Sequence, residues 1–511
     1  MKVVIVGGGT AGWMTATWLA NQNALYREDK IEQIDVTVIE SSDIPIIGAG
    51  EGTTALMHQF VSNRCKALKI NELDFFKGSK AVPKYGIRFK DWNGIGTEFL
   101  SPIQPSDTAA YTLDGEFLSA IMSGNYYDAS AAGYLMSRGL TDFHKDLKQN
   151  MGIHAYHFDA HKVGEFFKNI CVKNGVKHID AKVQDVNINP LTGECDSVKL
   201  EGIETPLEGD IWIDCTGFAR LLMTKMGAKW ISYSDELPTN SALTYIHQFE
   251  KGPEEAKLET LAWSMPNGWM WQIPTQDRYG CGYVYSDRFV TDEQALDELQ
   301  KATGRKIQPM RKLTFNPGRL DKFWIKNVMA VGLSSSFLEP LQATSIHTSL
   351  IQFDTIFSTY FSTNKTEFLL EQNIRKYNDF MGFLIDEYKD LIRVHYYNKR
   401  DDSEFWRFCN KELPMSNSVK EIIELCKYKS PSHFDFESYH GASGWGVWCW
   451  TLYGLGTLPK SSVMNTLRKF STINYTQQIH ANTLKKGNSL SPICQTQSEL
   501  ISNIINNKLS I

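Results

Sequence analysis

The order of apolar and polar residues at the start of the chain predicts one strand–turn–helix–strand unit. Residues 2–6 are a short apolar run after a lysine, which is typical of a buried parallel strand. A glycine-rich turn follows at residues 7–12, and residues 11–22 have the spacing of a helix. Residues 34–40 repeat the strand pattern and end in a carboxylate, Glu40. This order predicts a parallel α/β sheet that begins at the N-terminus.

The later part of the chain changes from strand-like runs to helical periodicity. The strand-like runs lie at residues 209–214, 243–250, 280–286 and 327–332. From about residue 345 to 430 the spacing of Phe, Tyr and Leu indicates helices, and residues 431–456 are rich in Gly, Trp and His. The segment after about 470 is polar, with one amphipathic piece near 499–509. No repeat or obvious linker divides the chain, so we expect one structural unit.

Composition and charge exclude several classes of function. The chain has 511 residues, of which 42% are hydrophobic, enough for a large core. Its net charge is -5 and no basic tract favours nucleic acid or an anionic membrane. No apolar run reaches membrane-spanning length, and residues 2–6 are too short for a signal-peptide core, so we expect a cytoplasmic protein.

The nine cysteines are scattered singly, without a Cys-x-x-Cys pair. An odd number at irregular spacing is typical of reduced, buried thiols. We therefore predict neither a disulfide framework nor a zinc site, and no other metal.

The glycine turn is the first candidate for chemistry. Gly7 permits a tight turn, Gly9 lets the backbone approach a pyrophosphate, and Gly12 lets the helix pack on the strand. The helix N-terminus then directs its free N–H groups at phosphate charge. Glu40, at the end of the second strand, is placed to accept a hydrogen bond from the adenosine ribose. Together these features predict a dinucleotide site.

Small residues at two later strand ends favour FAD over NAD. Asp214 and Gly217 follow one strand, and Gly332 follows another, ahead of three serines. Recurring strand ends with small residues suit the two-part cradle that FAD requires. The predicted fold is therefore α/β, an FAD-binding Rossmann-like fold of the aromatic-hydroxylase type with a mixed sheet.

Ordered motifs over roughly residues 2–460 give the chain a resemblance to the flavin-dependent halogenases of the tryptophan halogenase family. The motifs are Gly-Gly-Gly-Thr-Ala-Gly-Trp at 7–13, Ile-Pro-Ile-Ile-Gly-Ala-Gly-Glu at 44–51, Lys-Tyr-Gly-Ile-Arg-Phe at 84–89, His-Phe-Asp-Ala-His at 157–161, Asp-Cys-Thr-Gly-Phe at 214–218, Gly-Trp-Met-Trp-Gln-Ile-Pro at 268–274 and Phe-Leu-Glu-Pro-Leu at 337–341. The resemblance implies an FAD-binding halogenase body at 1–345 and a mainly helical, substrate-covering region at 346–511, packed as one unit. It extends the cofactor-binding set to Thr10, Ala11, Trp13, Gly48, Gly50 and Glu51.

The resemblance also implies a mechanism. Reduced FAD from a separate flavin reductase reacts with oxygen to give a flavin hydroperoxide, which halide attacks to give hypohalous acid. This acid travels through an internal tunnel to a small aromatic substrate. Trp269 and Trp271, with Ile273 and Pro274, resemble the family's barrier between flavin and substrate.

Lys84 matches the family lysine at the end of the tunnel. Its ammonium can polarise hypohalous acid through a hydrogen bond, or its amine can form a haloamine. Burial favours the neutral amine that the second route requires. A surface lysine on an alternating strand is the alternative, and Lys80 is the second choice if the alignment slips.

The chain departs from the family after the Glu-Pro-Leu segment. Gln342 stands where the family has a glutamate, so it keeps a hydrogen-bonding carbonyl but loses the charge and the base. Thr344 and Ser345 replace the Thr-Gly step that is associated with halide binding. Ser345 adds a side chain where glycine is usual and restricts the turn, so we expect an altered halide preference. Bromide or iodide should be preferred over chloride, because they are more easily oxidised and tolerate a looser site.

The substrate end also differs. Our alignment places Ala442 and Ser443 where the family has an aromatic pair, which implies a roomier pocket. Ser443, Trp445 and Trp448 are the candidate pocket residues, although core packing is the common fate of tryptophan. Another indole, a phenol or an electron-rich heteroaromatic is as plausible a substrate as free tryptophan.

Several alternatives remain open. The scaffold also suits a flavin monooxygenase that hydroxylates its substrate directly, or a non-catalytic flavin-binding relative in which Gln342 marks lost activity. His157 and His161 fit a structural or FAD-proximal role better than a metal site. His347 could reach the active site, and His395 could line the joint between the two regions or a solvated loop. The polar, amphipathic tail is compatible with self-association into a homo-oligomer.

Overall fold

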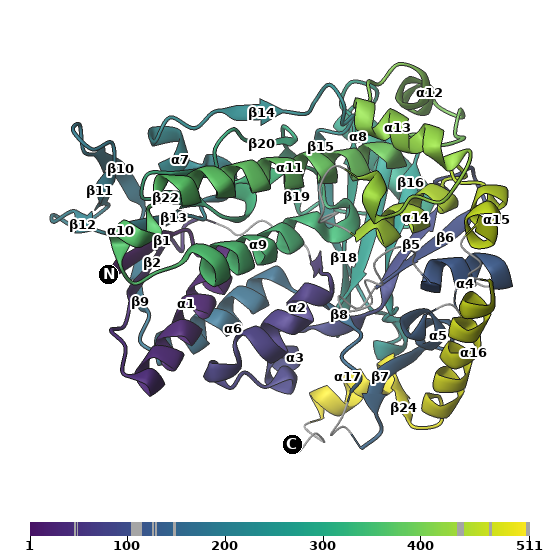
Figure 1. Cartoon of the computed structure of the whole chain (residues 1–511), viewed down its shortest axis with the longest axis horizontal. Coiled ribbons are helices and arrows are strands. Elements are labelled where there is room, and N and C mark those ends of the chain that lie inside the picture. Colours follow the sequence, from purple (N-terminus) through teal and green to yellow (C-terminus); the bar gives the residue numbers. More distant parts are fainter. Residues whose placement is uncertain are drawn as a thin grey trace.

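The computed structural model of the chain combines two large sheets with a mainly helical C-terminal part (Figure 1). It describes residues 1–44, 48, 50–103, 115–124, 127, 130–146, 150–436, 444–469 and 473–506. The mixed α/β architecture confirms the predicted fold class.

A six-stranded sheet contains the N-terminal unit. Its strands, in spatial order, are β21 (Trp324–Ile325), β22 (Val328–Ala330), β13 (Ile211–Asp214), β1 (Lys2–Val6), β2 (Asp35–Glu40) and β9 (Lys177–Asp180). All neighbours are parallel except β21 and β22, which gives the predicted mixed sheet. Val3 pairs with both Val36 and Ile211, so β1 is central and buried from Val3 onward. The first two predicted strands and the runs at 209–214 and 327–332 are therefore confirmed.

The first helix is longer than the sequence pattern indicated. Helix α1 spans Thr10–Asp29, whereas the spacing predicted a helix only to about residue 22. Its buried residues end at Asn23, so the last turns are largely solvent-facing and have no apolar stripe to reveal them. Asn23 exchanges hydrogen bonds with the backbone of Ile34 and joins the end of the helix to the start of β2.

A seven-stranded sheet forms the second layer. Its strands, in spatial order, are β19 (Arg311–Thr314), β15 (Ser241–Gln248), β18 (Arg278–Tyr285), β17 (Gly268–Pro274), β16 (Glu259–Met265), β5 (Gly86–Lys90) and β6 (Glu98–Pro102). Only β16 and β5 are parallel. The predicted runs at 243–250 and 280–286 correspond to β15 and β18, within two residues at each end.

A small antiparallel sheet lies at the edge of these layers. In it β8 (Ala155–Phe158) pairs with β3 (Glu51–Gly52) on one side and with β4 (Val82–Lys84) on the other. Lys84 is opposite Ala155, and His157 is opposite both Val82 and Gly52. This sheet therefore brings three of the sequence motifs together.

The remaining elements are shorter strands and the helices. The strands are β7 (Leu140–His144), β10 (Val183–Ile188), β11 (Cys195–Leu200), β12 (Leu207–Glu208), β14 (Trp230–Ser232), β20 (Gly318–Leu320), β23 (Ser336–Phe337) and β24 (Cys494–Thr496). The helices up to residue 303 are α2 (Ala55–Gln59), α3 (Glu72–Ser79), α4 (Gly115–Ser123), α5 (Ala131–Ser137), α6 (Ala160–Lys173), α7 (Leu221–Lys225) and α8 (Asp292–Thr303). The later helices are α9 (Thr344–Thr355), α10 (Lys365–Phe368), α11 (Glu371–His395), α12 (Glu404–Lys411), α13 (Asn417–Cys426), α14 (Gly444–Gly454), α15 (Lys460–Lys469), α16 (Ile473–Leu490) and α17 (Gln497–Ile505).

The polar C-terminal segment folds back onto the body. Strand β24 pairs with β7, and the yellow helices α15 and α16 lie beside the blue helix α4 (Figure 1). Helix α17 corresponds to the amphipathic piece predicted near 499–509, and it buries Leu500, Ile501 and Ile504. The division of the chain at residue 345 stays a prediction.

All nine cysteines are buried and none is in a disulfide, as predicted. Among the described helices, none combines the length and the apolar character that crossing a bilayer requires.

Candidate active site

One cavity of about 560 Å³ extends from the glycine turn after β1 to the tryptophans of β17. It is lined by segments that are far apart in the sequence, contributed by both large sheets and by α9. The predicted site residues that line it are Gly7, Gly9, Thr10, Ala11, Glu40, Gly48, Gly50, Glu51, Lys84, Gly217, Trp269, Trp271, Ile273, Gly332, Gln342 and Ser345. The structure therefore brings the cofactor motif and Lys84 into a single space.

The glycine turn has the shape that a pyrophosphate requires. At Gly7, with φ +113°, an added Cβ would lie 2.2 Å from the carbonyl oxygen of Cys215, and at Gly12 it would lie 1.9 Å from that of Gly7. At Gly9 no atom of the described residues lies within 4 Å of the same position. Two glycines are thus required by close packing, and the third leaves the backbone open to a ligand. These residues fit FAD.

Glu40 lines the cavity, and its carboxylate is also held by neighbouring side chains. One carboxylate oxygen accepts hydrogen bonds from Lys168 Nζ at 2.5 Å and pairs with His178 Nε2 at 2.9 Å. The other accepts from the indole N–H of Trp13 at 3.1 Å. These contacts fix the carboxylate at the end of β2, where a ribose would be recognised.

Six other predicted residues do not line the cavity. They are Gly12, Trp13, Asp214, Pro274, Thr344 and Trp448. The carboxylate of Asp214 accepts hydrogen bonds from the backbone N–H groups of Thr216, Leu222 and Met223, so it shapes the turn after β13. Trp448 is buried in α14. Ser443 and the side chain of Trp445 lie outside the described residues.

Lys84 is buried, with a side chain that faces the cavity and not solvent. The residue is 1% exposed, and Nζ donates a hydrogen bond to the main-chain oxygen of Thr53 at 2.9 Å. Burial lowers the pKa of this amine to about 7, because the charged form loses its hydration. Lys80, the second choice, is partly exposed and lies 3.4 Å from Asp277.

Three residues beside Lys84 were not assigned to the site from the sequence. An added Cβ at Gly52 would lie 3.2 Å from Lys84 Nζ, 3.3 Å from Thr260 Oγ1 and 3.5 Å from a ring carbon of His157. Thr260 lines the cavity, and its hydroxyl lies 2.7 Å from His157 Nε2. Burial, with the nearby charge of Lys84, lowers the pKa of His157 well below its ordinary value. Pairing of β3 and β4 with β8, which no local pattern shows, creates this group.

The two tryptophans of β17 stand on one face of their strand. Trp269 is 1% exposed and Trp271 is 8% exposed, and their ring centroids are 6.0 Å apart. Gly282 on β18 makes room for Trp271, because an added Cβ there would lie 2.1 Å from the indole. The pair therefore forms a rigid aromatic wall of the cavity.

The turn before α9 differs from the prediction in one respect. The sequence suggested that Ser345 restricts the turn, but Ser345 lies in the first turn of α9. The left-handed residues are instead Gln342, with φ 62°, and Ala343, with φ 57°. Two consecutive non-glycine residues in this region are uncommon, and the strain is held by the surrounding contacts.

Comparison with known proteins decides the family. The family model described as tryptophan halogenase matches residues 2–469. The chain belongs to the tryptophan halogenase family. A tryptophan 6-halogenase of Streptomyces albogriseolus is 29% identical, over 96% of this chain and 95% of the relative. A tryptophan 7-halogenase of Lentzea aerocolonigenes is 28% identical, over 86% and 85%.

Solved structures agree with these relatives. A tryptophan C-6 flavin-dependent halogenase (chlorinase) from taromycin biosynthesis superposes with a TM-score of 0.84, 27% identity and coverage of 98% of this chain and 99% of that one. A tryptophan halogenase from Shewanella frigidimarina gives 0.86 and 25%, over 99% and 97%. The family, the enzyme class and the divergence predicted from the sequence are confirmed.

This halogenase also holds two carboxyl groups at or near the cavity, of which Glu51 is partly buried and Glu339 is buried. Glu51 lines the cavity, and burial raises its pKa to about 7. Glu339 lies behind the tryptophan wall, where its carboxylate accepts hydrogen bonds from Tyr396 and Thr239. Burial raises the pKa of Glu339 to about 7, although these hydrogen bonds oppose the shift. The Phe-Leu-Glu-Pro-Leu motif was recognised from the sequence, but Glu339 itself was not assigned a role.

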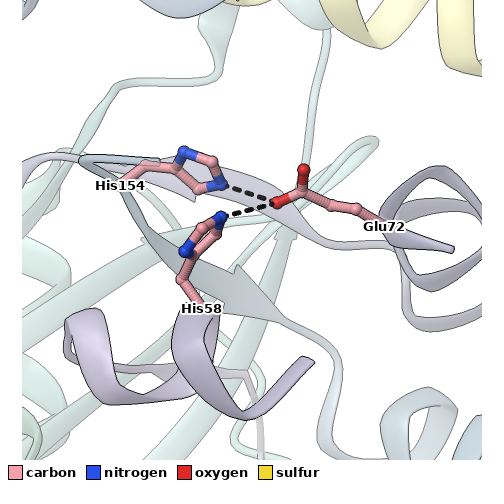
Figure 2. Close-up of side chains that lie close together, drawn as sticks. All are labelled: His58, Glu72 and His154. Atoms are coloured by element: carbon pink, nitrogen blue, oxygen red, sulfur yellow. Dashed lines mark hydrogen bonds and ion pairs between the residues drawn. The ribbon is translucent and has the colours of Figure 1, made fainter. Parts of the chain in front are cut away.

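A second polar cluster lies on the opposite face of β8 from His157. His58, Glu72 and His154 converge there (Figure 2), with ligand-type atoms within 4.8 Å of one another. His154 Nε2 lies 2.8 Å from Glu72 and Nδ1 lies 2.9 Å from Asp142, so both ring nitrogens face carboxylates. A metal would need one nitrogen without its proton. The contacts favour a buried ion network around a protonated His154.

Proposed function

We propose that the chain is a two-component halogenase that makes hypohalous acid in the FAD part of the cavity and uses it at Lys84. The observation that supports this is the single cavity shared by the glycine turn, the tryptophan wall and a buried lysine. When bound, reduced FAD would supply the electrons that activate oxygen for the oxidation of halide. The acceptor would be an electron-rich aromatic such as an indole, a phenol or another heteroaromatic.

The chain's own residues would hold the cofactor in this proposal. Gly7 and Gly9 would approach the pyrophosphate, and Glu40 would bind the ribose. Gly217 and Gly332, both with positive φ, border the other part of the cavity. A separate flavin reductase would supply the reduced cofactor.

Halide would bind at the start of α9. Thr344 and Ser345 occupy the first turn, where backbone N–H groups have no partner inside the helix and the helix dipole is positive. Ala343, Ser345 and Ile346 line the cavity, so this helix end faces it. We expect bromide or iodide to be used in preference to chloride, because both are more easily oxidised.

Lys84 would guide the last step. Its ammonium would donate a hydrogen bond to the oxygen of hypohalous acid and make the halogen more electrophilic. The tryptophan wall would keep the aromatic substrate away from FAD. Gln342 cannot act as a base, so the ring proton would pass to water.

The proposal is tested with the purified chain, a flavin reductase, FAD, NADH and each halide, against a panel of indoles, phenols and heteroaromatics. We expect a halogenated product by mass spectrometry, with bromide or iodide favoured in competition. Hydroxylated product without halide would identify a monooxygenase instead. Absence of any flavin-dependent product across the panel would identify a non-catalytic relative.

A further inference from the structure

A hydroxyl group shares the space at Gly52 with the ammonium of Lys84. The position that a Cβ would take at Gly52 lies 3.2 Å from Lys84 Nζ and 3.3 Å from Thr260 Oγ1. Residue 52 has no side chain to separate the two polar atoms from the cavity, and all three residues line it. A small oxygen-containing molecule above Gly52 would therefore meet two hydrogen-bonding groups, not one.

The hydroxyl has one neighbour that fixes its direction. Among the described residues, the only hydrogen-bond partner of Thr260 Oγ1 is His157 Nε2, at 2.7 Å. His157 is fully buried, and its Nδ1 has no hydrogen-bond partner in the described part of the chain. A buried N–H without an acceptor is the rarer and more costly arrangement. The proton of the neutral ring is thus placed on Nε2, where it is donated to Thr260.

This assignment leaves the hydroxyl hydrogen of Thr260 unused by His157. The oxygen accepts from the ring, and its own hydrogen can be donated into the cavity. A hydroxyl that accepts one hydrogen bond also becomes a better donor. The chain then presents an ammonium and an oriented O–H to the same space.

We propose that Thr260 is a further catalytic residue, which binds the oxygen of hypohalous acid together with Lys84, and that His157 is its positioning residue. The inference rests on the proposed function. As the carbon–halogen bond forms, the halogen–oxygen bond breaks and its electron pair stays on oxygen. The oxygen takes a proton from the Lys84 ammonium and leaves as water, the ring later releases its proton to water, and Thr260 stabilises the oxygen throughout.

Three variants of the full-length chain test the role of Thr260. Thr260→Val keeps the shape of the side chain and removes the hydroxyl, and Thr260→Ser restores it. Thr141→Val is the matched control, because Thr141 is a fully buried threonine whose hydroxyl bonds to Gln495 on β24 and which does not line the cavity. Each is loaded with FAD, supplied with reductase and bromide, and assayed both for brominated aromatic and for free hypobromous acid with a scavenger dye.

We expect Thr260→Val to lose at least about tenfold in brominated product, since a preorganised donor is worth about 10²–10³ in comparable sites. Dye bromination should rise in the same sample, because the oxidant is still formed but is no longer held. FAD affinity, measured by fluorescence, should be unchanged. Thr260→Ser should recover most of the product, and Thr141→Val should match the parent protein.

Gly52→Ala and His157→Phe are independent tests of the same arrangement. Residue 52 has no positive φ, so the backbone accepts alanine, and its methyl group would press on Lys84 Nζ and Thr260 Oγ1 without removing a polar atom. We expect lost product with retained FAD binding. His157→Phe should lose less product than Thr260→Val. In the double variant, the loss should equal that of Thr260→Val alone.

The outcomes separate this inference from the function on which it rests. If the parent protein halogenates and Thr260→Val does so equally well, without dye bromination, the role of Thr260 is wrong. The same holds if product and FAD affinity fall together, because that pattern describes a structural residue. If the parent protein yields no halogenated product with any halide, the proposed function itself fails.

Discussion

The side-chain nitrogen of Gln342 lies 3.1 Å from Nε2 of His395, at the position where the resemblance to the family implies a glutamate. His395 is fully buried, and its Nδ1 lies 2.7 Å from the main-chain oxygen of Leu391. Burial lowers the pKa of His395 to about 4, despite that hydrogen bond. The ring is therefore neutral at pH 7, and its free nitrogen accepts the amide hydrogen of Gln342. This pair explains how the position tolerates an uncharged residue.

Replacing Gln342 with glutamate should change the pH dependence of stability. A carboxylate facing the lone pair of His395 is relieved only if the ring takes up a proton, so the folded pKa of His395 would rise above the unfolded value. The stability contributed by the protonated ring is fully present below the unfolded pKa of His395 and is lost as pH rises through the folded pKa. We expect Gln342→Glu to be destabilised by about 1–3 kcal/mol at pH 8 and by less at pH 5.5. Denaturant unfolding at the two pH values measures this, and equal losses would contradict the assignment.

Removing the amine of Lys84 should separate oxidant formation from its use. Lys84→Met retains the length of the buried side chain but cannot donate to Thr53 or to hypohalous acid. We expect halogenated product to fall by about 10²-fold or more, while NADH and oxygen consumption continue. Mass spectrometry and an oxygen electrode measure the two quantities. If oxygen consumption fell in parallel with product, Lys84 would be needed to form the oxidant and not only to use it.

The ionisation of Lys84 should be visible in the rate of halogenation. Burial lowers its pKa to about 7, so the ammonium is lost as pH rises through that value. If the ammonium holds the oxidant, product formation falls above about pH 7. Lys84→Arg stays charged throughout this range, so its rate of product formation should not fall near pH 7. Any pH dependence that comes from ionisation of hypohalous acid should remain in this variant. A rate that rises with pH in the parent protein would favour the haloamine route.

The ion network around His154, of which Figure 2 shows His58 and Glu72, should contribute a stability term that depends on pH. Burial alone would lower the pKa of His154, but the charges of Asp142 and Glu72 outweigh it and raise the pKa from 6.5 to about 10. This stabilisation is complete below pH 6.5 and is lost as pH rises through about 10, with a slope of about 1.4 kcal/mol per pH unit. Titration of the unfolding free energy from pH 7 to 9.5 measures the slope.

His154→Gln should remove that slope. It should also cost about 3–5 kcal/mol at pH 7, because the buried carboxylate of Asp142 and the partly buried one of Glu72 lose their counter-charge. The matched control is His161→Gln, on the exposed side of α6. A slope that persists in the His154 variant would assign the pH dependence to another group.

The sequence allowed the N-terminal unit and the family to be predicted because their signals are local. Gly7, Gly9 and Gly12 stand in one six-residue motif, although Gly7 packs against Cys215, and the strand patterns at 2–6 and 34–40 need no partner to be recognised. The tryptophan motif likewise sits on a single strand. Such features depend on short-range geometry, which residue order expresses directly.

The group around Lys84 could not be predicted in the same way. Thr260 is on β16 and His157 is on β8, and neither residue type is unusual in a strand. Their approach to Gly52 depends on β3, β4 and β8 pairing and on the placement of β16 beside β5. The sequence also predicted the restricted turn at Ser345, whereas the left-handed residues are Gln342 and Ala343. A serine where glycine is usual can be seen in the sequence, but the residue at which α9 begins cannot.

The burial of all nine cysteines has a consequence for the lifetime of such an enzyme. Thiols are among the groups that hypohalous acids attack most readily, and attack follows exposure and thiolate content. Burial raises the pKa of Cys171 and Cys281 to about 12, which leaves almost no thiolate at neutral pH. A catalyst that releases such an oxidant inside itself would thus keep eight of its nine thiols off the cavity wall, and its turnover number before self-inactivation would depend on Cys215, which lines the cavity.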